Sequence, residues 1–113
     1  MKIVDNQITH KELKEMAAAS FGNMIKAVVD LKKGIMAVDA PLHADEEALL
    51  LEHGSKNEDL WGINLYPDLT GPDLIEYDSM INLRPAQNNQ TRGVEDPAIR
   101  QNIAALVNKL VIG

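Results

Sequence analysis

Apolar residues alternate with other residues along several stretches of the chain, which is the pattern of β-strands with one buried face. Two such stretches, residues 25–31 and 35–38, are separated by Lys33-Gly34. A two-residue turn there would place Lys32 opposite Ile35, and the apolar side chains of both strands would then share one face. The pattern therefore predicts an antiparallel hairpin in this register.

A second hairpin is predicted from residues 63–66 and 74–84, which flank a loop rich in glycine and proline. The segment 74–84 alternates along its whole length and is the clearest strand pattern in the chain. Leu65 is expected opposite Ile75, which again brings the apolar positions to the same face.

Three helices are predicted around these hairpins. The first covers residues 10–21, where Thr9 and Glu12 have the spacing of a capping box. The second covers residues 43–54, with acids in the first turn and a glycine at the end. The third follows Asp96-Pro97, an N-cap residue and an N1 proline, and its apolar stripe consists of Ile99, Ile103, Leu106, Val107 and Leu110.

The element order predicts an α+β fold, because strands joined by tight turns form antiparallel sheets. We expect a sheet of two hairpins in the order α-β-β-α-β-β-α, with all three helices packed on its apolar face. A length of 113 residues predicts a single domain, 1–113. Residues 1–8 are expected to form a short edge strand or an arm.

Charge is distributed unevenly along the chain. The formal net charge is −6, yet residues 36–83 hold eleven acids against one base, Lys56. An acidic middle argues against binding to nucleic acid or to an anionic membrane surface, since both need clustered cations. The other interpretation of the acidic stretch is a solvated surface that keeps the protein soluble.

Several classes of chemistry are excluded by what the sequence lacks. The chain has no cysteine, so thiol catalysis, disulfides and cysteine-based metal sites are ruled out. It has no glycine-rich nucleotide motif and no apolar run long enough to span a membrane. We therefore predict no cofactor, and because no apolar leader precedes the first helix we expect a cytoplasmic protein.

His43 and Asp45 are the candidate catalytic residues, because they combine a titratable pair with a helix start. The alternative is structural: an acid in the first turn stabilises the helix dipole. His53 lies at the other end of the same predicted helix, ~15 Å away, so the two histidines should not share a metal ion. We predict no metal site.

The chain has only three arginines, and all lie in or beside the polar loop 85–96. A guanidinium fork suits carboxylate or phosphate groups, so this loop is the candidate ligand-binding region. The candidate ligand-binding residues are Asn82, Arg84, Asn88 and Arg92. The alternative is that the arginines hold the acidic middle of the chain and the amides hold the loop's own backbone.

Two segments, LHADEEALLLEHGSKNEDLWGINLYP and SMINLRPAQNNQTRGVEDPAIR, are distinctive. In them the chain resembles a small family of uncharacterised prokaryotic proteins classed as a domain of unknown function. The resemblance covers roughly residues 24–112. It implies a prokaryotic, cytoplasmic, stand-alone protein, and it supplies no activity and no catalytic residues.

Two hypotheses about function remain open at this stage. The first is a non-catalytic binding or interaction module, whose partner is a small anionic ligand or a protein, with a homo-oligomer also compatible. The alternative is a small hydrolase-like enzyme that uses His43 and Asp45, with Arg84 or Arg92 holding an anionic group. The two differ in geometry, because the enzyme requires these side chains to line one cleft.

Overall fold

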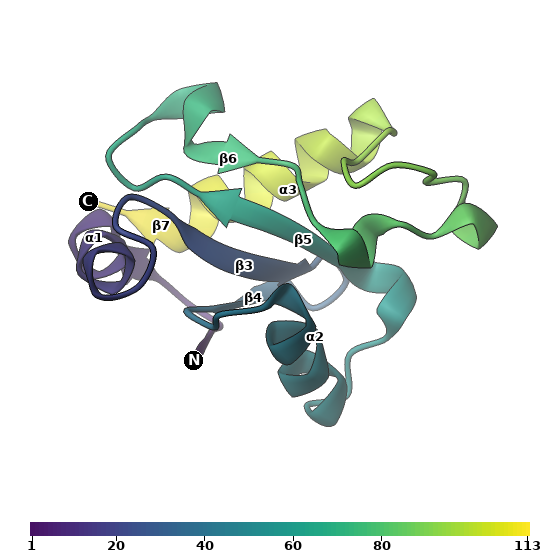
Figure 1. Cartoon of the computed structure of the whole chain (residues 1–113), viewed down its shortest axis with the longest axis horizontal. Helices are drawn as coiled ribbons and strands as arrows, with labels where there is room; N and C mark the ends of the chain where they lie inside the picture. The colour runs from purple at the N-terminus through teal and green to yellow at the C-terminus, as the bar shows by residue number, and fades with distance from the viewer.

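The computed structural model describes all 113 residues and contains one antiparallel sheet of five strands, in the order β1-β4-β3-β5-β6 (Figure 1). The strands are β1 (Lys2–Val4), β3 (Ile25–Asp30), β4 (Ile35–Val38), β5 (Leu60–Leu65) and β6 (Ile75–Glu76). The N-terminal edge strand is confirmed: β1 pairs with β4, with Ile3 opposite Ala37.

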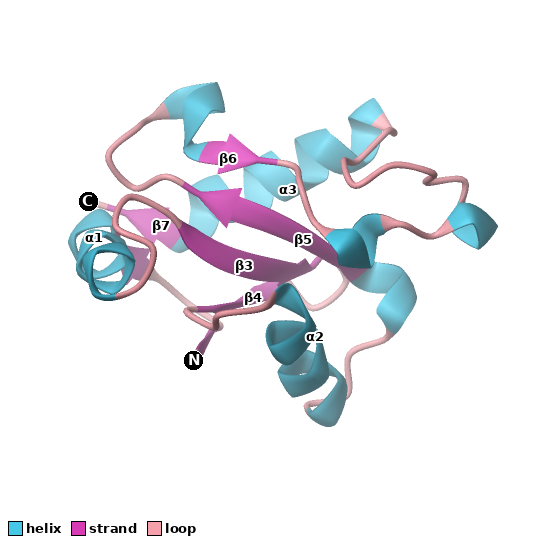
Figure 2. Ribbon diagram, in the orientation of Figure 1, coloured by secondary structure: helices cyan, strands magenta, loops and turns pink.

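Three α-helices surround the sheet (Figure 2): α1 (His10–Ala19), α2 (His43–Glu52) and α3 (Pro97–Leu110). The predicted caps form, since Thr9 Oγ1 accepts a hydrogen bond from Glu12 N at 3.1 Å and Asp96 Oδ1 accepts one from Ala98 N at 2.8 Å. The loops contain four short 3-10 helices: η1 (Asn57–Asp59), η2 (Gly71–Leu74), η3 (Met80–Asn82) and η4 (Pro85–Gln87).

The two ends of the chain meet in a second, parallel sheet of two strands, β2 (Ile8–Thr9) and β7 (Val111–Ile112). The sequence did not predict this pair, because two-residue strands carry no alternation to detect. No helix in the structure is both long enough and apolar enough to cross a membrane.

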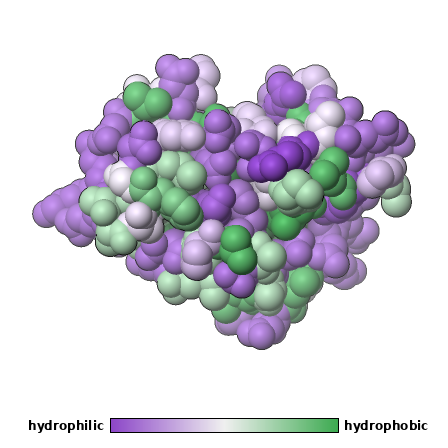
Figure 3. Space-filling view, in the orientation of Figure 1, coloured by the Kyte–Doolittle hydropathy of each residue, from purple (hydrophilic) through white to green (hydrophobic).

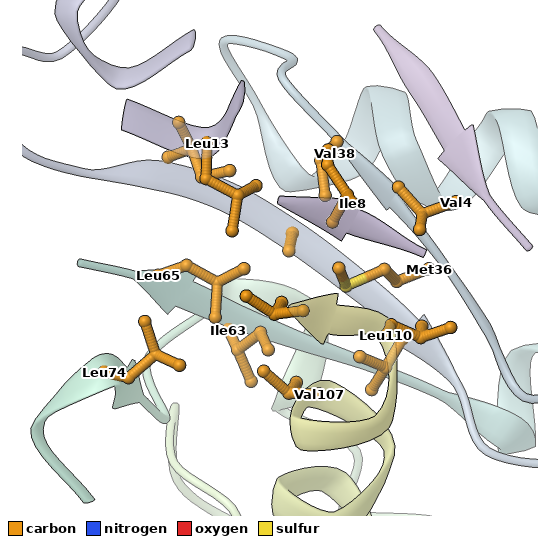
Figure 4. Packing of buried hydrophobic residues seen from close by; sticks show 14 of the residues in the cluster. Val4, Ile8, Leu13, Met36, Val38, Ile63, Leu65, Leu74, Val107 and Leu110 are labelled. Carbon is orange, nitrogen blue, oxygen red and sulfur yellow. The ribbon is translucent and has the colours of Figure 1, made fainter. Parts of the chain in front are cut away.

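The sheet lies between two layers of helices, so the prediction that all three helices pack on one face is wrong for α2. The larger core lies on the α1 and α3 side and includes Leu13 of α1, Ile63 of β5 and Val107 of α3 (Figure 4). On the other face a smaller cluster joins α2 to the sheet; its buried members are Val28, Ala37, Leu50 and Leu60. The central strand β3 contributes apolar side chains to both faces, Ala27 and Val29 to the larger core and Val28 to the smaller cluster, which is why each face can be covered.

The first hairpin forms, but its predicted register is wrong by two residues. Asp30 lies opposite Ile35, and the connection is the four-residue loop 31–34. The carboxylate of Asp30 explains this loop, because its Oδ1 accepts hydrogen bonds from the backbone N–H groups of Lys32 and Lys33, both at 2.9 Å. Such an Asx turn competes with the tight turn. A two-residue shift keeps every side chain on its predicted face.

The predicted strand 74–84 is also wrong in extent, since β6 ends at Glu76. The expected pairing of Leu65 with Ile75 is confirmed within that short strand. Further along β5, a side chain occupies the place of the missing strand. Gly62 N donates to Asn82 Oδ1 at 2.9 Å, and Asn82 Nδ2 donates to Gly62 O at 3.0 Å. The Asn82 carboxamide thus makes the hydrogen bonds at the edge of β5 that a neighbouring strand was expected to make.

Candidate functional site

Asn82, one of the candidate ligand-binding residues, is completely buried and fully engaged within the chain. Besides its two bonds to Gly62, its Nδ2 donates to the carbonyl oxygen of Arg92 at 2.9 Å. Its own carbonyl accepts from Asn89 Nδ2 at 2.7 Å. These contacts tie the loop 83–93 to the edge of β5, so Asn82 holds the loop's shape.

Arg84 lies against the sheet rather than facing a ligand. Its guanidinium carbon is 4.3 Å from the centre of the Trp61 ring, and the group donates to the carbonyl oxygens of Asn57 and Leu60. Burial lowers the pKa of Arg84 from its ordinary value. Asn88 is exposed, on the far side of the 3-10 turn η4, with a left-handed φ of 60°. Arg84 is therefore a clamp between η1 and β5.

Arg84→Lys is expected to lower the free energy of unfolding by about 1–2 kcal/mol, because lysine keeps the charge but loses the planar fork and the stacking on Trp61. Urea denaturation at pH 7 measures this loss. Arg92→Lys is the control: its ion pair with Asp78 is roughly half exposed on both sides and should contribute less than about 1 kcal/mol. Equal losses in both variants would contradict the clamp.

His43, the first residue of α2, is 8% exposed and lies over the sheet. Its Nε2 is 2.7 Å from the carbonyl oxygen of Ile63. Because a carbonyl can only accept, Nε2 carries the proton, and the lone pair of the neutral ring is on Nδ1. Burial is the main cause that lowers the pKa of His43, so the ring is neutral at pH 7. Nδ1 has no hydrogen-bond partner and is not fully enclosed.

Charged side chains from three other segments lie within electrostatic range of His43. Lys26 of β3, Asp78 after β6 and Arg92 of the polar loop each act on its pKa, the cations lowering it and Asp78 raising it. Arg92 Nε donates to Asp78 Oδ1 at 2.7 Å, whereas its two terminal amino groups have no hydrogen bond within the chain. Figure 3 shows this face, where hydrophilic surface separates hydrophobic side chains near α1 from those near η3.

Asn64 belongs to the same cluster, because it follows Ile63 and lies opposite Lys26 in the sheet. Its Nδ2 donates to Glu76 Oε1 at 2.8 Å and to Asp78 O at 3.4 Å, two groups that accept, so the orientation of the amide is determined. Its Oδ1 is buried and has no partner. A buried acceptor without a donor is uncommon and costs free energy unless something else supplies the bond.

The start of α2 adds a backbone feature to this cluster. Its N-cap residue, Leu42, has no side-chain hydrogen bond to the first turn, in contrast to the N-caps of α1 and α3. Amide groups left open at a helix start attract negative charge. We call His43, Lys26, Asn64, Arg92 and the first turn of α2 the sheet-face site.

The sheet-face site contains only some of the candidate residues. It includes His43 and Arg92, which lies within electrostatic range of His43, whereas Asn82, Arg84 and Asn88 take other roles. Asp45 makes no hydrogen bond to His43 and lines a concavity on another side of α2. Sequence reasoning missed Lys26 and Asn64. Their signal was a polar residue between apolar residues in each of two strands, at positions that share one face of the sheet.

The sheet-face site is a shallow surface. None of the four surface concavities of the protein includes His43, Asn64 or Arg92. No group of three or more histidine and acidic side chains in the structure could hold a metal ion.

The fold and the site define a small α+β protein with a polar patch on one sheet face. The chain belongs to the family described as "Protein of unknown function (DUF5674)", whose family model matches residues 2–110. This confirms the resemblance seen in the sequence. No curated protein and no solved structure matches the chain.

Proposed function

We propose that the protein is a non-catalytic binding module whose sheet-face site takes a small hydroxylated organic anion. The observation that carries the proposal is the open polar chemistry around His43. Donors for an anion and an acceptor for a hydroxyl group come from separate elements and meet on one face. The acidic composition favours a small-molecule ligand over nucleic acid or a membrane surface. We also propose that the protein is cytoplasmic.

The anionic group of the ligand would lie beside Arg92 and the start of α2. The terminal amino groups of Arg92 are unused, and Asp78 holds its Nε at 2.7 Å, which orients the fork. An oriented guanidinium binds carboxylate or phosphate through two parallel hydrogen bonds. Lys26 adds positive potential on the same side.

The hydroxyl group of the ligand would donate to His43 Nδ1. The bond from Nε2 to Ile63 O keeps the ring in the tautomer that leaves Nδ1 as an acceptor, and burial keeps it neutral. A neutral acceptor next to cations favours a ligand that carries both a negative charge and a hydroxyl donor, such as a hydroxy acid.

The same geometry weighs against the hydrolase alternative. An acid–base pair needs hydrogen-bond reach between its members, and His43 is bonded to a backbone carbonyl instead of to Asp45. Arg84, one of the two proposed holders of the anionic group, is stacked on Trp61 and bonded to two carbonyl oxygens, which leaves only Arg92 for that role. The enzyme hypothesis therefore lacks the His43–Asp45 contact that it requires.

The proposal is tested with L-malate and succinate, two dicarboxylates that differ by one hydroxyl group. NMR titration should show saturable shifts of the first-turn amides of α2, and L-malate should bind about tenfold more tightly than succinate, the effect of one added hydrogen bond of about 1.4 kcal/mol. Arg92→Gln should weaken both ligands about tenfold or more, because a charge-assisted fork is lost.

Lys109→Gln is the matched control, since Lys109 is an exposed cation in the last turn of α3, far along the chain from the site. Its affinity for L-malate should equal that of the wild type. Absence of saturable shifts with both dicarboxylates, or an equal loss in Lys109→Gln and Arg92→Gln, would contradict the proposed function.

A further inference from the structure

The two most exposed large apolar side chains of the protein both lie next to residues of the sheet-face site. Met80, the first residue of η3, is 62% exposed, and Leu42, the N-cap residue of α2, is 59% exposed. Scattered apolar side chains are ordinary on a protein surface. These two are not scattered, because each borders one of the groups that give the site its binding chemistry.

Leu42 stands immediately before His43, at a position where leucine adds little to the stability of the fold. Its side chain makes no hydrogen bond to the first turn of α2, and leucine is one of the least favourable N-cap residues for this reason. At this exposure it also buries little apolar surface. The side chain of Leu42 is therefore free to contact a ligand that is bound at His43.

Met80 is held beside Arg92 by hydrogen bonds of the backbone. The carbonyl oxygen of Arg92 accepts from Ser79 N and from Asn82 Nδ2, both at 2.9 Å, and these two residues lie on either side of Met80 in the chain. The turn η3 also lies close to α2 (Figure 1). Met80 therefore borders the site at its arginine, as Leu42 borders it at its histidine.

The apolar surface at Leu42 and Met80 suits a hydrocarbon chain. Two side chains are far too small a patch for a stable protein interface, which takes about 800 Å² from each partner. The methionine side chain is flexible and adapts to apolar groups of different shape. The surface is also open, since none of the four concavities includes either residue. A hydrocarbon chain that lies on it is therefore shielded from water on one side only.

We propose that the sheet-face site binds an aliphatic hydroxy acid, whose hydrocarbon chain lies on Leu42 and Met80. The inference rests on the proposed function and narrows its ligand to one class of hydroxy acid. The carboxylate would bind Arg92, the hydroxyl group would donate to His43 Nδ1, and the hydrocarbon chain would run over the two apolar side chains. A longer chain removes more apolar surface from water, so the affinity should rise with chain length.

NMR titration with L-lactate and L-2-hydroxyhexanoate tests the inference, because the two acids differ only by three methylene groups. A methylene group that is fully removed from water gives about a fourfold gain in affinity, and one that is covered on a single side gives about twofold. The longer acid should therefore bind about eightfold more tightly than lactate. Nuclear Overhauser contacts between its terminal methyl group and the ε-methyl group of Met80 should accompany binding.

The double variant Leu42→Ala, Met80→Ala removes the apolar surface without adding a helix cap. It should bind lactate like the wild type and should prefer the longer acid by less than about twofold. Leu51→Ala, Ile112→Ala is the matched control, because it removes two exposed apolar side chains that lie outside the site. The control should keep the preference of the wild type.

Equal affinities of the wild type for the two acids, an unchanged preference in Leu42→Ala, Met80→Ala, or a loss of the preference in the control would each overturn the inference. Arg92→Gln separates such a failure from a failure of the proposed function, since it should weaken the binding of both acids about tenfold. Absence of saturable binding of both acids, or binding that Arg92→Gln leaves unchanged, would overturn the proposed function and the inference together.

Discussion

Between pH 5 and pH 8 the wild-type protein is expected to lose about 4 kcal/mol of folding stability through Glu46, a loss that Glu46→Gln should abolish. The carboxyl group is completely buried beneath α2, and burial raises its pKa to about 9 from 4.5. Such a group contributes its full stability below the unfolded pKa and loses it as pH rises toward the folded pKa. Between the two pKa values the free energy of unfolding falls by about 1.4 kcal/mol per pH unit, so the three units from pH 5 to pH 8 correspond to about 4 kcal/mol.

Urea denaturation at pH 5, 6, 7 and 8 measures this effect as the difference between the two pH profiles. Glutamine keeps the size of the side chain and an acceptor for Ala40 N, which donates to Glu46 Oε2 at 3.0 Å, but it cannot ionise. Glu52→Gln is the control, because Glu52 is an exposed acid on the same helix. Its profile should follow the wild type. Parallel profiles for wild type and Glu46→Gln would show that the buried carboxyl does not control the pH dependence.

Asn82→Ala is expected to lower the free energy of unfolding by about 3–5 kcal/mol. The substitution removes the bonds to Gly62 N, Gly62 O and Arg92 O at 2.9, 3.0 and 2.9 Å. Each buried backbone group left without a partner costs about 1–3 kcal/mol. Gly62 already packs closely against Ser79, since a β-carbon added at Gly62 would lie 2.5 Å from that side chain.

Urea denaturation again gives the measurement, with Gln90→Ala as the control. Gln90 is an exposed amide in the same loop, and its side chain makes no hydrogen bond within the chain, so its removal should change stability by less than about 0.5 kcal/mol. A loss below about 1 kcal/mol in Asn82→Ala would mean that water can replace the carboxamide at the edge of β5.

Elements specified by contacts close in sequence were predictable from the sequence alone. The caps at Thr9 and Asp96 act over two or three residues, and both helices begin where these caps predict. The apolar stripe of α3 predicted its burial, and Ile103 and Leu110 are buried in the core. The short pairing of β5 with β6 followed from matching apolar positions.

Elements specified by a distant side chain were not predictable in this way. Alternation in residues 74–84 favoured a long strand. In the structure the side chain of Asn82, twenty residues from Gly62 in the chain, bonds to the edge of β5 instead. Alternation in β3 and β4 fitted two registers equally well, and the carboxylate of Asp30 selected the longer loop. In each case one polar side chain forms hydrogen bonds with backbone groups that a regular strand pairing would use. The spacing of hydrophobic residues carries no information about such side-chain bonds.

The sequence by itself thus determined the three helices, the α+β class and the pairing partners of the strands within each hairpin, but neither the register of the first hairpin nor the length of the second. Only the tertiary structure decided that α2 covers the opposite sheet face, that Lys26 and Arg92 come within electrostatic range of His43, and that Arg84 is a clamp. Local propensity and periodicity act within a few residues, whereas these arrangements depend on which sheet face each element covers, and that is decided by packing between segments far apart in the chain.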